Sequence, residues 1–216
     1  MSIKNLLQQT IAASRQLITL SDEAINRILT DTAGELMNRQ AEVLAVNEKD
    51  LSRMDPANPK YDRLKLTTDR LEGIAGDMRN VATLPSPLGK VLSETTRPNG
   101  MVIRKVSVPF GVIGVIYEAR PNVTFDVFSL CFKSGNACVL KGGSDADDSN
   151  RALVGIIHQV LERHGVNPAV CCLLPPDREA TTELLNAVGL VDLIIPRGSS
   201  SPVSYTHLTL PTIYSV

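Results

Sequence analysis

The sequence has no excess of charge of either sign. It carries 22 basic and 23 acidic side chains, so it lacks the positive charge typical of nucleic-acid-binding proteins. It has no basic run that would bind anionic lipid, and its longest apolar run is far too short to span a bilayer. Residues 1–14 lack the continuous apolar core and cleavage pattern of a signal peptide. We therefore expect a cytoplasmic protein without nucleic-acid or membrane partners.

Cysteine is scarce and is not arranged for metal binding. No C-x-x-C pair occurs, and no histidine lies at metal-ligand spacing, so no metal site is expected. All the cysteines lie in apolar runs, which predicts buried, reduced thiols rather than disulfides. They are Cys131, Cys138, Cys171 and Cys172.

The common catalytic and nucleotide-binding motifs are absent. The sequence contains neither G-x-G-x-x-G nor G-x-x-x-x-G-K-[ST], and no serine elbow. None of the three histidines is well placed for acid–base catalysis: His158 and His164 fall on an expected helix, and His207 lies near the chain's end. Function must therefore be inferred from the order of elements and from the residues at their ends.

The first third of the sequence predicts helices. Ser21 and Thr67 each precede an acidic first turn and an apolar stripe at helical spacing, which is typical of capped amphipathic helices. Residues 54–63 contain two prolines and several turn formers and are expected to form a loop. Further on, Asn99–Gly100 separates two extended runs, which predicts a β-hairpin over residues 91–106.

From residue 111 onward, apolar β-branched runs alternate with helical patterns. This alternation predicts a parallel, doubly wound sheet, an α/β fold in which ligands bind at the carboxyl ends of the strands. The expected strands are 111–117, 137–141, 169–174 and 191–195, and the expected helices are 123–134, 147–164 and 178–188.

The residues that follow these strands are suited to an anionic ligand. A lysine supplies a cation, glycines leave the backbone accessible, and the helix after residue 144 offers N–H groups to a phosphate. An arginine and an asparagine after the first strand could hold an acidic group or an oxyanion. The residues are Arg120, Asn122, Lys141, Gly142, Gly143, Ser144, Arg197 and Gly198. Simpler readings stay open: Lys141 as a solvated charge, Gly142–Gly143 as a plain turn, and Pro121–Asn122 as a turn and helix cap.

At these residues the sequence resembles the gamma-glutamyl phosphate reductases of the aldehyde dehydrogenase superfamily. The resemblance spans residues 1–198, and its specific segments are KVSVPFGVIGVIYEARPNVTFD, SGNACVLKGGS, GVNPAV and VDLIIPRG. It implies an aldehyde-dehydrogenase-like, Rossmann-like sheet with N-terminal helices and a hairpin. It also implies reduction of L-glutamyl 5-phosphate with NADPH, giving the semialdehyde and phosphate, in proline biosynthesis. In the family the hairpin often serves subunit contact, which implies a homo-oligomeric parent.

The resemblance also implies site roles. Lys141 matches the lysine that contacts the adenosine ribose and meets the 2′-phosphate of NADP, and a point charge suits that phosphate. Ser144, with Gly142 and Gly143 before it, stands where some relatives carry a ribose-binding glutamate, and a neutral residue there fits NADPH. Arg197–Gly198 matches the turn that faces the pyrophosphate. Asn122 aligns, across a gap, with the amide that stabilises the oxyanion.

Two departures from the family pattern bear on activity. Residues 145–148, Asp-Ala-Asp-Asp, are more acidic than usual next to the expected phosphates, which is expected to weaken cofactor binding. The family's nucleophilic cysteine lies in a second, catalytic domain, and none of the four cysteines lies in its motif. We therefore expect no turnover from this chain. The alternatives are a non-catalytic nucleotide-binding fragment and another aldehyde dehydrogenase, against which the segment YEARPN argues.

The end of the sequence does not continue the expected fold. Residues 202–208, Pro-Val-Ser-Tyr-Thr-His-Leu, fit the codons CCT-GTC-TCT-TAT-ACA-CAT-CTG, which resemble the end of a transposon adapter used in sequencing libraries. We expect a truncated cofactor-binding unit over residues 1–198 and an adapter-derived segment over 199–216. The alternative is a natural divergent tail. Genomic DNA that encodes the tail without an adapter match would contradict the expectation.

Overall fold

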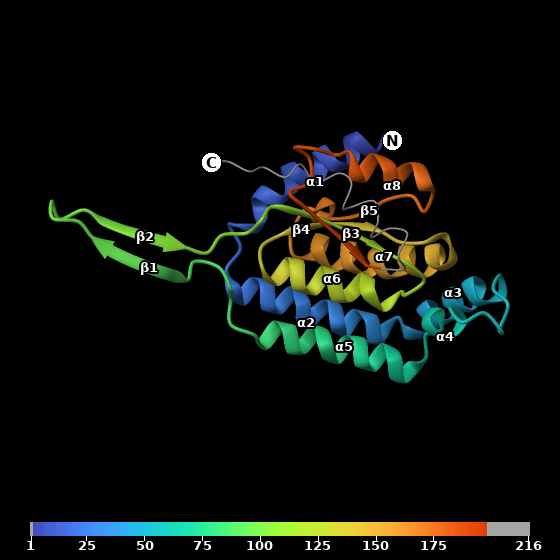
Figure 1. Ribbon diagram of the computed structural model, residues 1–216. Helices are drawn as coiled ribbons and strands as arrows, with labels where there is room; N and C mark the ends of the chain where they lie inside the picture. The colour runs from blue at the N-terminus through green and yellow to red at the C-terminus, as the bar shows by residue number, and fades with distance from the viewer. Residues whose placement is uncertain (1, 198–216) are drawn as a thin grey trace.

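The computed structural model describes residues 2–197 and confirms the predicted α/β fold (Figure 1). A parallel sheet has the strand order β5-β4-β3-β6. Its strands are β3 (Val112–Tyr117), β4 (Ala137–Lys141), β5 (Cys171–Leu173) and β6 (Leu193–Arg197). The chain leaves β3, adds β4 and β5 on one side, and then returns to place β6 on the other side of β3. All four carboxyl ends therefore lie along one edge of the sheet.

The central strands are apolar because both faces of the sheet are covered. Every residue of β3 and β4 is buried. The predicted third strand is shortened to three residues, since Pro168–Val170 forms a 3-10 turn before β5. The predicted fourth strand begins and ends later than expected, and Arg197 is its last residue. This shift places the Arg197 side chain at the edge where the other strands end.

Helices cover the sheet on both faces (Figure 1). One face carries α6 (Asn122–Lys133) and α7 (Asp147–Arg163), with α2 (Asp22–Asn38) and α5 (Thr68–Thr83) packed outside them. The other face carries α1 (Ile3–Leu17) and α8 (Arg178–Leu185). The core between these layers is a continuous apolar cluster, and a smaller cluster forms around Leu64, Ala119 and Ala146.

The capping residues begin the N-terminal helices as predicted. The Ser21 hydroxyl accepts a hydrogen bond from the Ala24 backbone N–H at 3.2 Å, and the Thr67 hydroxyl accepts one from Arg70 at the same distance. Beyond α2 the chain forms α3 (Gln40–Ser52). The predicted loop over residues 54–63 is partly wrong, since it ends in a short helix, α4 (Tyr61–Leu64), whose Leu64 side chain is buried.

The predicted hairpin is confirmed and projects from the body of the molecule (Figure 1). Strands β1 (Val91–Thr96) and β2 (Val102–Val106) pair antiparallel, and Gly100 adopts a positive φ of 83° in the turn between them. All residues of both strands are exposed, including Leu92 and Ile103. An isolated two-stranded ribbon is only marginally stable in water, so its exposed apolar residues call for a covering partner.

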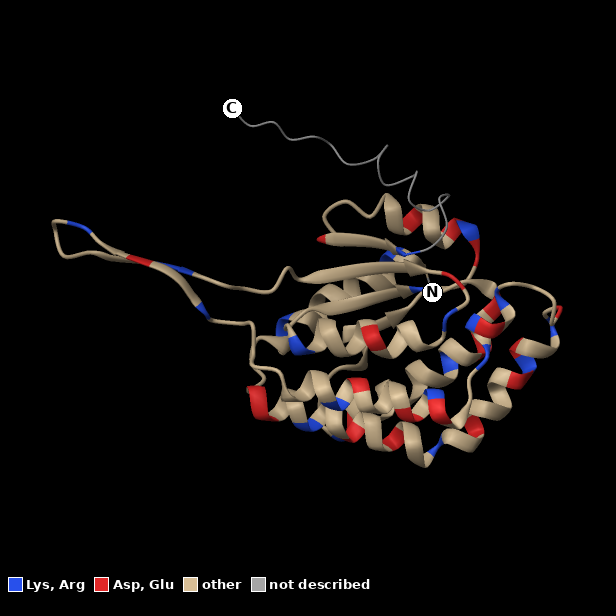
Figure 2. Cartoon of the chain, turned by 60° about the horizontal axis from the view of Figure 1, so that its bottom comes forward, with Lys and Arg blue, Asp and Glu red and all other residues tan. Residues whose placement is uncertain are grey.

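Charged residues of both signs are interspersed over the helices, whereas the sheet strands are almost uncharged (Figure 2). Within residues 2–197, no helix combines the length and the apolar character needed to cross a bilayer.

Candidate functional site

The strand order creates a topological switch point between β3 and β6. From β3 the chain winds outward in one direction, and it reaches β6 only after crossing back. In such sheets the helices on either side of the switch leave in opposite directions and open a crevice where ligands bind. The segment Glu118–Asn122 after β3 and Arg197 at the end of β6 flank this crevice. Lys141 lies one strand further along the same edge, at the end of β4.

Lys141 is buried and tied to two neighbouring loops. Its Nζ donates hydrogen bonds to the carbonyl oxygens of Gly142 at 2.8 Å and Pro176 at 3.1 Å. Burial lowers the pKa of Lys141, and the nearby carboxylates of Asp177 and Asp147 oppose that shift. The Lys141 ammonium group is therefore fixed in place by hydrogen bonds and is not a solvated surface charge. An ammonium group has three donors, so one remains for a ligand at the strand end.

The two glycines after Lys141 have different roles. A Cβ on Gly142 would lie 2.3 Å from the Asn150 Nδ2 atom. Asn150 is held in place because its Oδ1 accepts a hydrogen bond from the Thr124 hydroxyl at 3.0 Å. The missing side chain at Gly142 therefore makes room for Asn150, and the expectation that Gly142 leaves the backbone accessible to a ligand stays a prediction. A Cβ on Gly143 would meet nothing closer than the Glu118 backbone at 3.8 Å, so Gly143 is the position with free space.

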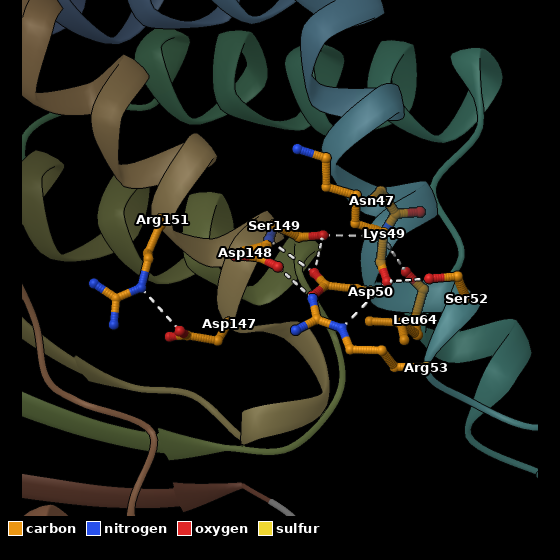
Figure 3. A network of polar contacts seen from close by, with 10 residues as sticks. All are labelled: Asn47, Lys49, Asp50, Ser52, Arg53, Leu64, Asp147, Asp148, Ser149 and Arg151. Carbon is orange, nitrogen blue, oxygen red and sulfur yellow. Dashed lines mark hydrogen bonds and ion pairs between the residues drawn. The ribbon is translucent and has the colours of Figure 1, made fainter.

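The N-terminus of α7, after Ser144, already binds a carboxylate of this chain (Figure 3). Oδ2 of Asp50, on α3, accepts hydrogen bonds from the Ser149 backbone N–H at 2.8 Å and from the Ser149 hydroxyl at 2.6 Å. The Asp50 side chain is fully buried, and Arg53 pairs with both Asp50 and Asp148. Asp50 therefore occupies the Ser149 N–H at this helix start, and the expectation that the helix start binds a phosphate stays a prediction. Ser144 itself is exposed.

Asn122 is the first residue of α6, and its side chain is already oriented. Its Nδ2 donates to the Asp126 carboxylate at 3.3 Å. Burial raises the pKa of Asp126, and Asp77 adds to the shift, while Arg197 and the Asn122 hydrogen bond oppose it. Asn122 also lines a cavity of about 410 Å³ that it shares with Arg63 and Arg120. The predicted helix-cap role is not seen, because Pro121 precedes the helix and no side chain caps it.

A second cavity, of about 290 Å³, lies at the switch point itself. Its walls come from the ends of β3 and β6 and from the segment around α4. They are Lys60, Arg63, Tyr117, Glu118, Ala119, Arg120, Val123 and Arg197. The structure therefore brings the predicted residues Arg120 and Arg197 together. Gly198 lies outside the described residues.

Lys60 and Arg63 were missed by the sequence reasoning. They lie in a segment whose prolines predict a loop, and nothing in their spacing links them to strand ends more than fifty positions later. Lys60 also lines a third cavity, of about 330 Å³, together with Ser144 and Arg53. Lys60 thus stands between Ser144 and the switch-point cavity. Only the packing of α3 against the start of α7, and of α4 against α3, reveals this arrangement.

The four cysteines are buried and free, as predicted. Burial raises the pKa of Cys131 and raises that of Cys172 to about 11. A hydrogen bond with Cys171, together with burial, raises the pKa of Cys138. Because the thiolate is the reactive form, these thiols are poorly suited to nucleophilic attack. Among the described histidines, His158 Nε2 bonds to the Cys171 carbonyl oxygen and His164 pairs with Asp31.

The comparisons with known proteins match this geometry. The chain is 74% identical over 215 residues to gamma-glutamyl phosphate reductase of Parabacteroides distasonis, an alignment that covers 99% of the chain and 52% of the relative. The crystal structure of gamma-glutamyl phosphate reductase from Thermotoga maritima superposes with a TM-score of 0.91 at 30% identity, over 95% of this chain and 50% of that one. The resemblance to the gamma-glutamyl phosphate reductases is confirmed.

The wider superfamily shares the fold. A probable aldehyde dehydrogenase from Listeria monocytogenes superposes with a TM-score of 0.73 at 16% identity, over 95% of this chain and 43% of that one. No protein-family model matches the chain. The chain spans about half the length of the curated gamma-glutamyl phosphate reductases that it matches.

Proposed function

We propose that this chain is the cofactor-binding half of an NADPH-dependent gamma-glutamyl phosphate reductase. The whole enzyme would reduce L-glutamyl 5-phosphate to L-glutamate 5-semialdehyde and phosphate, as a cytoplasmic step of proline biosynthesis. The level of identity supports this choice over another aldehyde dehydrogenase: the matched reductases are 29–74% identical, whereas the aldehyde dehydrogenase of Listeria is 16% identical.

One observation carries the proposal. The parallel sheet brings Lys141, Gly143, Ser144 and Arg197 to one edge, although they come from different strands and loops. A dinucleotide needs such a run of contacts, with a cation and hydrogen-bonding groups for the ribose end and a second cation for the pyrophosphate. The held ammonium of Lys141 would meet the ribose and its 2′-phosphate, and Arg197, with Gly198 after it, would face the pyrophosphate.

The preference for NADPH over NADH is part of the proposal. Ser144 is neutral and exposed, so it would not repel a 2′-phosphate as a glutamate would. Lys60 lines the same cavity and has no ion pair within residues 2–197. Asp50, Asp55 and Asp145 line it as well and oppose the phosphate, so Lys60 and Arg53, with Lys141 near by, must offset that charge.

The chain's part in the reaction is binding and orientation. When bound, the nicotinamide would supply the hydride. The Asn122 amide, held by Asp126, would donate a hydrogen bond to the carbonyl oxygen of the substrate where negative charge develops. The four cysteines are buried, which keeps them from a substrate, and burial raises the pKa of Cys131 and Cys172 and so disfavours their thiolates. We therefore propose that this chain binds NADPH without turnover.

Subunit contact through the hairpin completes the proposal. The strands β1 and β2 expose Leu92, Val102 and Ile103, each at least 43% accessible, on a ribbon that stands away from the body. Pairing with another copy would bury these residues and complete a larger sheet.

The test is a titration of the purified chain with NADPH, followed by nicotinamide fluorescence. The native chain is expected to bind, and Lys141→Met is expected to weaken binding by about tenfold or more, since a charge-assisted contact is worth about 1.5–3 kcal/mol. Arg97→Gln, on the exposed hairpin turn, is the control for loss of one positive charge and should bind as the native chain does. Equal NADPH affinity in the native and Lys141→Met chains would contradict the proposed site.

A further inference from the structure

The switch-point cavity is strongly basic, and of its cations only Arg197 has a described carboxylate, that of Asp126, acting on it electrostatically. Four cations line it, with one carboxylate, that of Glu118. Within residues 2–197, no hydrogen bond or ion pair involves the side chains of the four cations. They are Lys60, Arg63, Arg120 and Arg197. Some other cations of this chain are paired, as Arg53 is with Asp50 and Arg39 is with Glu42. Holding four like charges around one cavity is unfavourable unless an anion binds there.

Two of these arginines connect this cavity with the one that Asn122 lines. Arg63, on α4, and Arg120, in the segment after β3, each line both cavities. In the second cavity, Arg70 pairs with Asp62, so it does not compete as a free anion-binding group. An anion held by Arg63 and Arg120 would thus lie next to whatever group the Asn122 amide contacts.

We infer that Arg63 and Arg120 form the subsite for the phosphate of the acyl phosphate substrate. This inference rests on the proposed function, in which Asn122 contacts the oxygen of the reacting carbonyl. The phosphate is bonded to that same carbonyl carbon, so it must lie within a few bond lengths of Asn122. The substrate's other anion, the α-carboxylate, is at the opposite end of the carbon chain. Because Arg63 and Arg120 lie beside Asn122, the phosphate, and not the α-carboxylate, is the group of the substrate that they would bind.

The chemistry of the two side chains fits this anion. Guanidinium groups present several N–H donors in a plane and bind phosphate through paired hydrogen bonds. The cavity, at about 290 Å³, is at the small end of ligand pockets, which suits one group of a small metabolite and not a whole dinucleotide. Lys60 and Arg197 line the same cavity and add positive charge.

The test is a titration of the chain with inorganic phosphate at constant ionic strength. Binding is measured from shifts of the backbone amide signals in NMR spectra. The native chain is expected to shift the amide signals of residues 118–123. Arg63→Gln and Arg120→Gln are each expected to weaken phosphate binding by about tenfold or more. Arg63 is exposed and Arg120 is half-buried, so Arg63→Gln checks any loss of folding in Arg120→Gln. Arg97→Gln removes the same charge on the hairpin and should leave binding unchanged. Phosphate binding that is absent, or equal in all four chains, would overturn the subsite.

Two competition arms identify the source of the anion. Saturating NADPH, which would neutralise Arg197, should weaken phosphate binding without displacing phosphate, and full displacement by NADPH would assign Arg63 and Arg120 to the cofactor and overturn the inference. L-Glutamate, which carries carboxylates and no phosphate, should not displace phosphate, and displacement would overturn the inference in favour of a carboxylate subsite. If the chain binds phosphate through Arg63 but does not bind NADPH, the proposed function is contradicted. If it binds NADPH but not phosphate, only the phosphate subsite is contradicted.

Discussion

The Asp50 carboxylate accepts hydrogen bonds from both the backbone N–H and the hydroxyl of Ser149, at 2.8 and 2.6 Å. This contact joins α3 to the start of α7 across 99 positions of sequence. It also holds the α3–α4 segment, and with it Lys60 and Arg63, against the edge of the sheet. A structural tie between distant helices thus positions part of the candidate site.

Asp50→Ala is expected to destabilise the chain by about 3 kcal/mol, because it leaves the Ser149 donors buried and removes a charged acceptor. Urea unfolding followed by circular dichroism measures this change. Glu48→Ala, an exposed position on the same helix, is the control and should change stability little. A loss of less than about 1 kcal/mol in Asp50→Ala would show that the contact does not tie the two helices.

The cysteines are expected to be unreactive in the folded chain. Burial raises the pKa of Cys131, and that of Cys172 to about 11, so little thiolate is present at neutral pH. Ellman's reagent at mildly alkaline pH should label the native chain slowly and label all four cysteines after denaturation. An assay with NADP, phosphate and the semialdehyde should show no turnover. One rapidly labelled cysteine, together with turnover above background, would contradict this account.

Asp126→Asn is expected to stabilise the chain at neutral pH. Burial raises the pKa of Asp126, so the folded state disfavours the ionised carboxylate. The cost is absent below the unfolded pKa of about 3.9, where both states are protonated, and it develops as pH rises through the folded pKa. The variant's melting temperature should therefore exceed the native value at pH 7, and the difference should vanish at about pH 3.

Glu72→Gln, an exposed carboxylate on α5, is the control for the same charge change. If the stabilisation in Asp126→Asn were equal at both pH values, titration of Asp126 would not be its cause.

The hairpin is expected to drive self-association. Replacing Leu92 and Ile103 with lysine should lower the oligomeric mass seen by analytical ultracentrifugation, because it places charge on the exposed ribbon. The melting temperature of the separated chain should change little, since neither residue belongs to the core. Val188→Lys, at a residue 92% exposed and outside the hairpin, should leave association as in the native chain. A double variant that associates as before would rule out the hairpin contact.

Much of the fold follows from local signals in the sequence. The buried run before Glu118 predicts β3, Asn99–Gly100 predicts the hairpin, and the hydroxyls of Ser21 and Thr67 predict helix starts, all of which are confirmed. These signals work because each depends on neighbours in sequence. The boundaries of β5 and β6 were less well predicted, since the 3-10 turn before β5 and the pairing of β6 with β3 depend on tertiary packing.

The candidate site was predictable only in part. Strand ends can be located from the pattern, so Lys141 and Arg197 fall at the expected edge. Asn150 fills the space beside Gly142, and Asp50 accepts a hydrogen bond from the Ser149 N–H at the start of α7. Both are contacts between residues distant in sequence, and no local pattern encodes them. The tail over residues 199–216 lies outside the described residues, so its expected origin stays a prediction.

The most direct test of the account maps the NADPH site on the chain itself. A ¹⁵N backbone spectrum recorded during NADPH titration should show shifts at residues 141–144 and at Arg197, at the carboxyl ends of β4 and β6, and none on the hairpin. Signals that stay unchanged, or that move only in the groove between α1 and α7 near His158, would contradict a cofactor site at the carboxyl edge of the sheet.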